Sequence, residues 1–281
     1  MFAGGHMARK MISLFFGLVF ILGLGLVLYP TFSNWYNQFH ASRVISNYEQ
    51  SVEEIEDLSA YKNMAQAHNS EILNCGSLSS AIQMENSDSL KTYNSLLNVA
   101  DDGVMGVIRI PKIDVKLPIY HTSEDSVLQS GVGHYVGSSL PVGGKGTHCL
   151  LTGHRGLPSA KLFTNLDQLK KGDVFYLDVL DETLAYQVDS IRTVLPNVVE
   201  SLDPEPESDY VTLITCTPYG VNTHRLLVRG SRIPYVPEEE EKEIQEQAKS
   251  KMHWILPIGF VLLIILLLIL FKKRKSRNMG G

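Results

Sequence analysis

Two long apolar stretches divide this chain and constrain its fold more than any other feature. One runs from Met11 to Leu28 and the other from Trp254 to Phe271, and neither contains Asp, Glu, Lys or Arg. Each is long enough to cross a bilayer as an α-helix. About 225 residues lie between them, which is enough for one substantial domain with a helical preface.

Basic residues flank both stretches on the side of the nearer chain end. The first stretch is preceded by Arg9 and Lys10, and the second is followed by Lys272, Lys273, Arg274, Lys275 and Arg277. The positive-inside rule therefore predicts a two-pass protein of the cell membrane, with both termini in the cytosol and the region between the spans outside. A cleaved signal peptide is the alternative for the first stretch. The residues after it, Tyr29 to Trp35, contain no small-x-small cleavage pattern, so we expect an uncleaved anchor.

The distribution of apolar, charged and turn-forming residues along the chain predicts seven segments. Between Tyr36 and Leu97, apolar residues recur every three or four positions, which indicates one or two amphipathic helices, and the turn residues Asn98 to Gly103 end that pattern. Met1 to His6 are not expected to contribute to the fold. The predicted segments are a cytosolic leader (1–10), a transmembrane helix (11–29), a helical preface with a lid region (30–103), a β catalytic domain (104–236), an acidic linker (237–253), a second transmembrane helix (254–271) and a basic cytosolic tail (272–281).

From Val104 onward, short β-branched runs alternate with Gly, Pro, Asp and Asn. Many short strands at this spacing are typical of a closed barrel or a sandwich. A short helix is predicted over Ala160–Leu169, with Lys170 to Gly172 as its basic end, and the acidic run Glu238–Glu243 is interpreted as a solvated helix or linker. The predicted strands are Gly106–Ile110, Val115–Tyr120, His148–Thr152, Asp173–Leu180, Leu184–Val194, Val211–Thr215 and Arg225–Ile233.

Composition narrows the function classes. The net charge is only −5, so nothing points to nucleic acid as a partner. The three cysteines cannot all pair with one another, so at least one is free or bonds to another chain. An exposed thiol is unusual in oxidising surroundings, and this favours a chemical role for one of them.

Cys216 is the leading candidate nucleophile. It ends the apolar run Thr-Leu-Ile-Thr-Cys-Thr-Pro, where a strand gives way to a turn, and Arg225 opens the next such run. In adjacent antiparallel strands Arg225 would face Cys216, where a guanidinium can stabilise a developing oxyanion. His154 also ends a predicted strand and is the best candidate for proton transfer.

These residues and their flanks resemble the sortase family. The resemblance covers roughly Gly106 to Tyr235 and rests on Thr-Leu-Ile-Thr-Cys, on Leu-Thr-Gly-His-Arg, and on blocks such as Ile-Pro-Lys-Ile-Asp and Leu-Pro-Ile-Tyr-His. Sortases are membrane-tethered cysteine transpeptidases of Gram-positive bacteria with an eight-stranded β-barrel. The second apolar stretch and the helical preface resemble class C, the pilus-assembling sortases.

The resemblance implies a complete reaction. Cys216 would attack the Thr–Gly bond of an LPxTG-like sorting signal and form a thioester, His154 would handle the proton, and Arg225 would position the signal and support the oxyanion. A lysine amine of the next pilin subunit would resolve the acyl-enzyme, so the expected partners are pilins. Thr215, Thr217 and Leu213 are expected to bind substrate or to support the site, and no cofactor or metal is implied.

One departure concerns a lid. Many class C enzymes anchor a lid over the cysteine with Asp-Pro and an aromatic residue, but the corresponding stretch here, Leu96 to Gly103, has no such tripeptide. We therefore expect a site that is open at rest. A small thiol reagent should modify Cys216 quickly, and truncation before Val104 should change that rate by less than about tenfold.

The remaining cysteines and histidines are expected to be structural. Cys149 is interpreted as a small buried hydrophobe, Cys75 has no assigned role, and His121 and His134 are interpreted as structural or surface residues. His224 should point away from Arg225 because neighbouring residues in a strand face opposite sides. A metal site from His134, His148 and Cys149 has no recognisable ligand spacing.

Three alternatives to pilin polymerisation remain open. A housekeeping-type sortase would use an amine of the cell-wall peptidoglycan precursor. A non-catalytic membrane adaptor would keep the barrel without activity, although intact Cys216, His154 and Arg225 argue against it. A hydrolytic cysteine protease would not incorporate an added amine into product.

Overall fold

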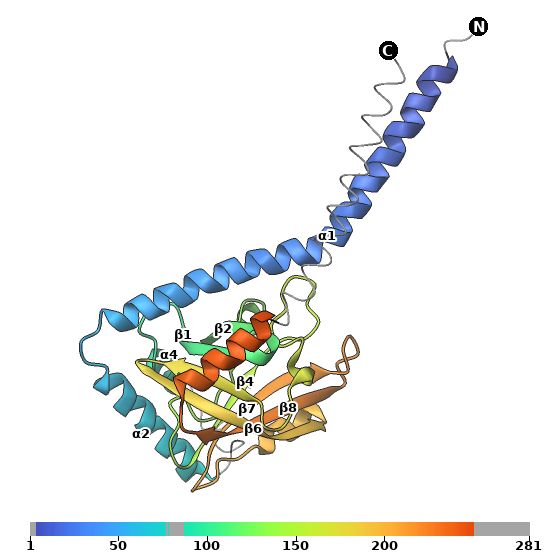
Figure 1. Ribbon diagram of the computed structural model, residues 1–281. Coiled ribbons are helices and arrows are strands. Elements are labelled where there is room, and N and C mark those ends of the chain that lie inside the picture. Colours follow the sequence, from blue (N-terminus) through green and yellow to red (C-terminus); the bar gives the residue numbers. More distant parts are fainter. Residues whose placement is uncertain (1–3, 77, 79–86, 250–281) are drawn as a thin grey trace. The chain divides into compact units, whose positions relative to one another are not determined.

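The computed structural model of the chain describes residues 4–76, 78 and 87–249 (Figure 1). Two compact units are present, Met1–Tyr235 and Val236–Gly281. In the second unit residues 237–249 are helical, and Glu240 of the acidic run is buried rather than solvated. The second predicted span, Trp254 to Phe271, and the tail 272–281 lie outside the described residues.

Helices form the preface of the first unit. They are α1 (Gly4–Glu53), α2 (Ser59–Cys75) and α4 (Ser87–Ser95). α1 contains the first apolar stretch and continues through Pro30 without interruption. Among the described residues, α1 is the one helix that is long and apolar enough to cross a membrane, and its apolar stretch is not buried. The left-handed Gly76, whose N–H binds the Leu73 carbonyl, ends α2.

Eight strands of the described residues close into a barrel. Their order around it is β1-β2-β3-β4-β7-β8-β6-β5. The β2/β3 and β4/β7 pairs are parallel, and the other pairs are antiparallel. The strands are β1 (Val104–Ile110), β2 (Val115–Tyr120), β3 (Val132–His134), β4 (Thr147–Thr152), β5 (Val174–Val179), β6 (Glu182–Val194), β7 (Asp209–Thr217) and β8 (His224–Ile233).

The structure confirms the barrel and corrects two details. β3 was not predicted, because three residues are too few to show an alternating pattern. The helix expected over Ala160–Leu169 is wrong, since only a 3-10 turn over Leu166–Gln168 forms there. The apolar side chains of this segment enter the barrel core from successive turns instead, and the Phe163 N–H binds the carbonyl of His154.

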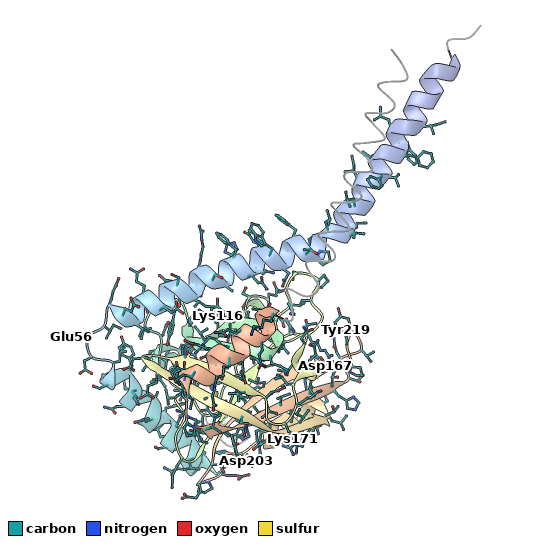
Figure 2. All side chains as sticks on the ribbon, viewed as in Figure 1. Glu56, Lys116, Asp167, Lys171, Asp203 and Tyr219 are labelled. Carbon is teal, nitrogen blue, oxygen red and sulfur yellow. The ribbon has the colours of Figure 1, made fainter. Side chains whose placement is uncertain are left out.

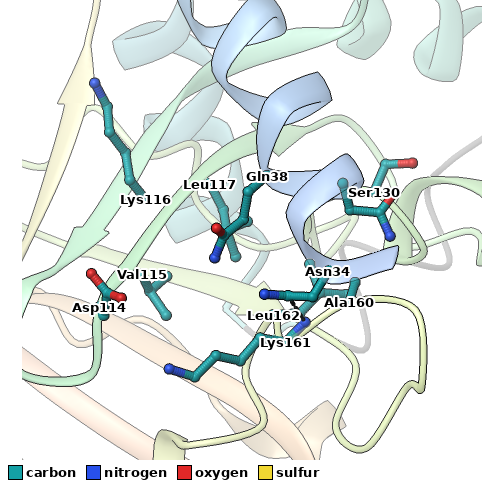
Figure 3. Close-up of a pocket in the computed structure, with 11 residues that line it drawn as sticks. Asn34, Gln38, Asp114, Val115, Lys116, Leu117, Ser130, Ala160, Lys161 and Leu162 are labelled. Carbon is teal, nitrogen blue, oxygen red and sulfur yellow. Dashed lines mark hydrogen bonds between the residues drawn. The ribbon is translucent and has the colours of Figure 1, made fainter. Parts of the chain in front are cut away.

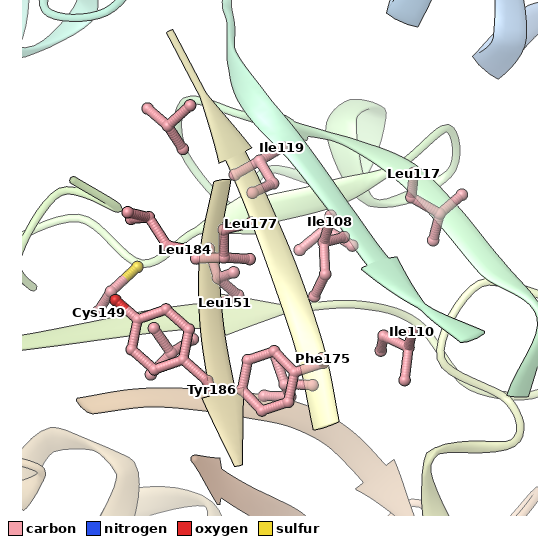
Figure 4. Close-up of a cluster of buried hydrophobic side chains, with 14 of the residues drawn as sticks. Ile108, Ile110, Leu117, Ile119, Cys149, Leu151, Phe175, Leu177, Leu184 and Tyr186 are labelled. Carbon is pink, nitrogen blue, oxygen red and sulfur yellow. The ribbon is translucent and has the colours of Figure 1, made fainter. Parts of the chain in front are cut away.

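Alternation along the strands sorts side chains to two faces of the barrel wall. One set fills the interior, including Cys149 and Leu151 of β4, with Phe175, Leu177 and Tyr186 beside them (Figure 4). Val211 and Leu213 of β7 belong to the same cluster. Each fully buried aliphatic side chain contributes about 1.5–3 kcal/mol. The interior holds β7 in place, so that the alternate residues of β7 face outward.

α1 packs on the barrel beyond its apolar stretch. Ile45 and Tyr48 form a cluster with Val104 and Val107 of β1. The Tyr48 hydroxyl donates to the Met105 carbonyl and accepts from the N–H of Leu180. Burial raises the pKa of Tyr48 to about 12, so the phenol stays neutral and keeps both bonds.

Candidate active site

Cys216 and Arg225 face each other across β7 and β8. They are direct partners in the antiparallel register, at the end of one strand and the start of the next. The turn Pro218–Thr223 joins the two strands. Both residues are partly exposed. The guanidinium donates to the carbonyls of Asn222 and His224, and among the described residues it has no carboxylate partner.

His154 follows β4, the strand that pairs with β7 on the side opposite β8. β4 and β7 are parallel, and Thr152 is the register partner of Ile214. Beyond the strand, the Gly153 N–H binds the Ile214 carbonyl at 3.0 Å and the Gly153 carbonyl accepts from Thr215 Oγ1 at 2.7 Å. His154 comes two residues after Thr152, and Cys216 comes two residues after Ile214, so both follow the last paired position of the two parallel strands by the same number of residues.

Two contacts with Phe163 hold the loop that carries His154. The carbonyl of His154 accepts from the N–H of Phe163 at 3.1 Å, which closes the loop. The Phe163 ring packs so tightly under Gly153 that an added Cβ would lie 2.7 Å from it. A side chain at position 153 would therefore displace the residue next to His154.

Arg155 joins the His154 loop to β7, and the sequence analysis did not identify it. Its guanidinium donates to Thr217 Oγ1 at 3.2 Å and forms an ion pair with Asp167. The side chain is 8% exposed, and its Nε has no partner among the described residues. Asp167 and Tyr219 lie on the same side of the barrel (Figure 2), where Tyr219 covers Gly156. The only sequence signal was the position of Arg155 directly after His154.

The three supporting candidates differ in their environments. Thr215 is buried and anchors Gly153 through its hydroxyl, and Thr217 accepts the bond from Arg155. Leu213 is fully buried in the barrel interior, on the face opposite Cys216. Its side chain therefore packs in the barrel core and not on the face that carries Cys216.

The outward face next to Cys216 carries an apolar floor. It consists of Leu150 of β4, Ile214 of β7 and Leu227 of β8, together with Leu202. Leu78, from the segment before the barrel, is part of the same cluster and is 1% exposed. Its N–H binds Asp203 Oδ1 at 2.8 Å. The thiol is thus partly exposed as expected, but the floor beside it is covered by a residue that the sequence analysis did not consider.

The other cysteines and histidines have structural environments. Cys149 and Cys216 are free cysteines, and Cys149 is buried in the core, where burial raises the pKa of its thiol. His134 is fully buried, and one ring nitrogen binds the Tyr93 hydroxyl at 2.8 Å. His148 bonds to Thr212 Oγ1 and to a backbone carbonyl. The structural interpretation of Cys149 and His134 is confirmed.

The structure is a closed β-barrel with a partly exposed cysteine, Cys216, directly opposite an arginine, Arg225. Residues 108–233 match the Sortase domain family. Sortase C1 from Streptococcus agalactiae is 46% identical, with 69% of this chain and 100% of that chain covered and a TM-score of 0.65. Clostridium perfringens sortase C with the C-terminal cell wall sorting motif is 40% identical (69% and 100% covered, TM-score 0.59), and Streptococcus pneumoniae sortase C is 43% identical (69% and 97%, TM-score 0.57).

The chain belongs to the sortase family, and the solved structures it resembles are sortases of class C. The first curated relatives are sortases as well, at 32% identity. The chain spans about half the length of these curated relatives, from 42% to 60%.

Proposed function

We propose that this chain is a membrane-anchored cysteine transpeptidase that cleaves LPxTG-like sorting signals between Thr and Gly and joins the acyl group to a pilin lysine. One observation carries the proposal: Cys216 and Arg225 are register partners across β7 and β8, and His154 follows the end of β4, the strand that pairs with β7 on its other side. A nucleophile between a proton carrier and a fixed cation is the arrangement that acyl transfer needs.

The first half of the reaction forms the thioester. The thiol proton passes to His154 as Cys216 Sγ attacks the carbonyl carbon of the signal's Thr. Arg225 stabilises the oxyanion of the tetrahedral intermediate through its planar, cationic guanidinium. When the intermediate collapses, the C–N bond breaks and the His154 imidazolium gives its proton to the leaving Gly amine.

The second half uses an incoming amine. A neutral lysine amine attacks the thioester, His154 accepts the proton it loses, and the departing Cys216 thiolate regains a proton from His154. The product is an isopeptide bond. Every proton and bond is accounted for by these side chains and the two substrates, so the proposal includes no cofactor or metal.

Two relatives support the substrate class. The Clostridium perfringens sortase C structure contains a C-terminal cell wall sorting motif, and the Streptococcus pneumoniae sortase C structure is described in terms of pilin substrate specificity. At 40% and 43% identity over 69% of this chain, these relatives share most of its barrel. Pilins with LPxTG-like signals are the substrates that fit both.

The proposed location is the cell membrane, with the barrel outside. α1 continues from the apolar stretch directly into the part that packs on β1, so cleavage between them would cut a single helix. By the positive-inside rule, Arg9 and Lys10 favour a cytosolic N-terminus, and the basic residues Lys272 to Lys275 and Arg277 favour a cytosolic C-terminus. Reporter fusions at either end should be cytosolic, and an external C-terminus would refute the two-pass topology.

The decisive test incubates the enzyme with candidate pilins and looks for laddered, SDS-resistant polymers. Cys216→Ala should abolish thioester formation, while His154→Ala and Arg225→Ala should lose on the order of a hundredfold or more with the fold retained. Polymer formation by Cys216→Ala would refute the nucleophile assignment. Incorporation of a peptidoglycan-type amine in preference to pilin lysine would favour the cell-wall-attaching alternative, and release of free acid alone would indicate a hydrolase.

A further inference from the structure

The part of α1 that follows the apolar stretch has two opposite faces. One face contacts the barrel unit: Asn34 Oδ1 accepts from the Lys161 N–H at 2.9 Å, and Asn37 Nδ2 donates to the Ser159 carbonyl at 2.7 Å. Ala41 is buried on the same face. Figure 3 shows Asn34 and Gln38 of α1 beside Lys161 around a small cavity of about 40 Å³. These contacts fix the rotation of the helix about its own axis.

The other face carries a stripe of aromatic rings. Phe32, Trp35 and Phe39 are 65%, 59% and 47% exposed, and they contact one another in sequence, with Trp35 stacked on Phe39 at 6.2 Å. Arg43 lies 4.7 Å from the Phe39 ring centre. Each ring lies two residues from a residue of the barrel face, which is about 200° around a helix with 3.6 residues per turn. The aromatic stripe, Phe32–Trp35–Phe39, therefore points away from the barrel.

We propose that the aromatic stripe lies in the headgroup layer of the membrane, so that α1 both anchors the barrel and sets its orientation on the lipid surface. This inference rests on the proposed membrane anchor. The lipid occupant follows from continuity: Met11 to Leu28 covers about 27 Å of helix, close to the hydrocarbon thickness, so the stripe begins about one turn beyond it. Aromatic rings are favoured at this depth.

Two further features of α1 fit a lipid surface. Pro30 lies between the apolar stretch and the stripe, and α1 changes direction along its length in Figure 1, as expected for a helix with an internal proline. In a chain of net charge −5, no Asp or Glu occurs from Tyr29 to Tyr48, while Arg43 does. A segment without carboxylates that includes a cation is suited to anionic headgroups.

The orientation has a consequence for the site. Asn34 and Asn37 hold residues 159 and 161, which belong to the loop that begins at His154. α1 thus contacts the lipid with one face and binds the His154 loop with the opposite face. Substrates tethered to the same membrane would then meet the site at a fixed height, which raises their effective concentration.

The test uses the full chain in vesicles of phosphatidylglycerol and phosphatidylcholine. The chain has two tryptophans, Trp35 and Trp254, so Trp254→Phe leaves Trp35 as the single reporter. We expect lipids brominated near the headgroup to quench Trp35 more strongly than lipids brominated near the chain ends. The matched control keeps Trp254→Phe and moves the single tryptophan to α2 with Trp35→Phe and Met64→Trp. Met64 is 48% exposed and outside the stripe, so its replacement should not be quenched.

Each other result overturns the proposal. A water-exposed emission without quenching would leave the stripe in solvent, and a blue-shifted emission without quenching would mean that a protein segment covers it. Stronger quenching by deep bromines would make the stripe part of the span. If the chain does not float with vesicles at all, the anchor itself fails, which is a separate result.

Activity gives an independent readout. Replacing the stripe by serines (Phe32→Ser, Trp35→Ser, Phe39→Ser) should leave cleavage of a soluble sorting peptide unchanged. It should slow cleavage of the same peptide tethered to the vesicle on the order of tenfold. Equal effects on both substrates would indicate a folding defect and overturn the orienting role.

Discussion

Leu78 covers the apolar floor beside Cys216, and its removal is expected to activate the enzyme. The side chain is buried against Leu150, Ile214 and Leu227 on the outward face of the barrel. A substrate that uses this floor has to displace it. The uncovered fraction of the enzyme then sets the apparent rate at low substrate concentration.

The magnitude follows from the buried area of one leucine. Leu78→Ala removes three carbon groups, each worth about 0.8 kcal/mol when buried, or about 2.4 kcal/mol together. At about 1.4 kcal/mol per factor of ten, the equilibrium between covered and uncovered floor shifts about fiftyfold. The hydrogen bond from the Leu78 N–H to Asp203 is unchanged by the substitution, and it continues to hold the segment.

Two measurements on the full chain in vesicles check this prediction. kcat/KM for a sorting-signal peptide should rise by up to about fiftyfold, and the amide at position 78 should exchange its hydrogen correspondingly faster. Leu73→Ala is the matched control, because it removes the same atoms from α2, where Leu73 lies against Gly146 rather than on the floor. If both rates stay within about twofold of the parent, Leu78 does not limit access and the reasoning is refuted.

Three more predictions concern the site and the core. Arg225→Lys should not restore activity lost in Arg225→Ala, since a point charge cannot reproduce a planar fork, and a kcat/KM within tenfold of the parent would contradict this. Gly153→Ala should cost about 1–3 kcal/mol in thermal unfolding and lower kcat, because the new methyl meets Phe163; unchanged values would refute it. Burial lowers the pKa of His134 to about 3. The contribution of neutral, buried His134 to the free energy of unfolding is complete above the pKa of an unfolded histidine, about 6.5. It is lost as the pH falls toward 3, at up to about 1.4 kcal/mol per pH unit. His134→Gln should flatten this slope in urea titrations, and the exposed His40→Gln should not.

The barrel and one half of the site could be predicted because their signals are local. β7 and β8 are joined by a short turn, so the pairing of Cys216 with Arg225 follows from strand ends that are close in sequence. The place of His154 is different. It depends on the parallel pairing of β4 with β7, which joins segments about sixty residues apart, and no local pattern specifies such a partner. For His154 the family resemblance supplied what the pattern could not.

The segment Ala160–Leu169 shows how tertiary contacts override a helical pattern. Its apolar residues Leu162, Phe163, Leu166 and Leu169 have nearly helical spacing, and all are buried. They reach the core through turns, because the backbone of this segment closes the His154 loop through the Phe163 N–H and binds Asn34 of α1 through the Lys161 N–H. A buried helix and this loop can show the same spacing of apolar residues in the sequence, so that spacing alone does not distinguish them.

The lid question has the same physical origin. The stretch Leu96 to Gly103 has no aromatic anchor, and this absence predicts an open site. Among the described residues, the cover is one aliphatic side chain, Leu78, about twenty positions earlier, in a polar stretch without periodicity. Its partners come from three strands, so the surface it fits exists only after the barrel has closed. An aromatic ring buries more area than a leucine and would hold the floor more firmly. Leu78 provides a cover that a substrate can displace at a cost of about 1.5–3 kcal/mol. The missing aromatic anchor therefore indicates a weaker cover over the floor, which a sorting signal can open by its own binding.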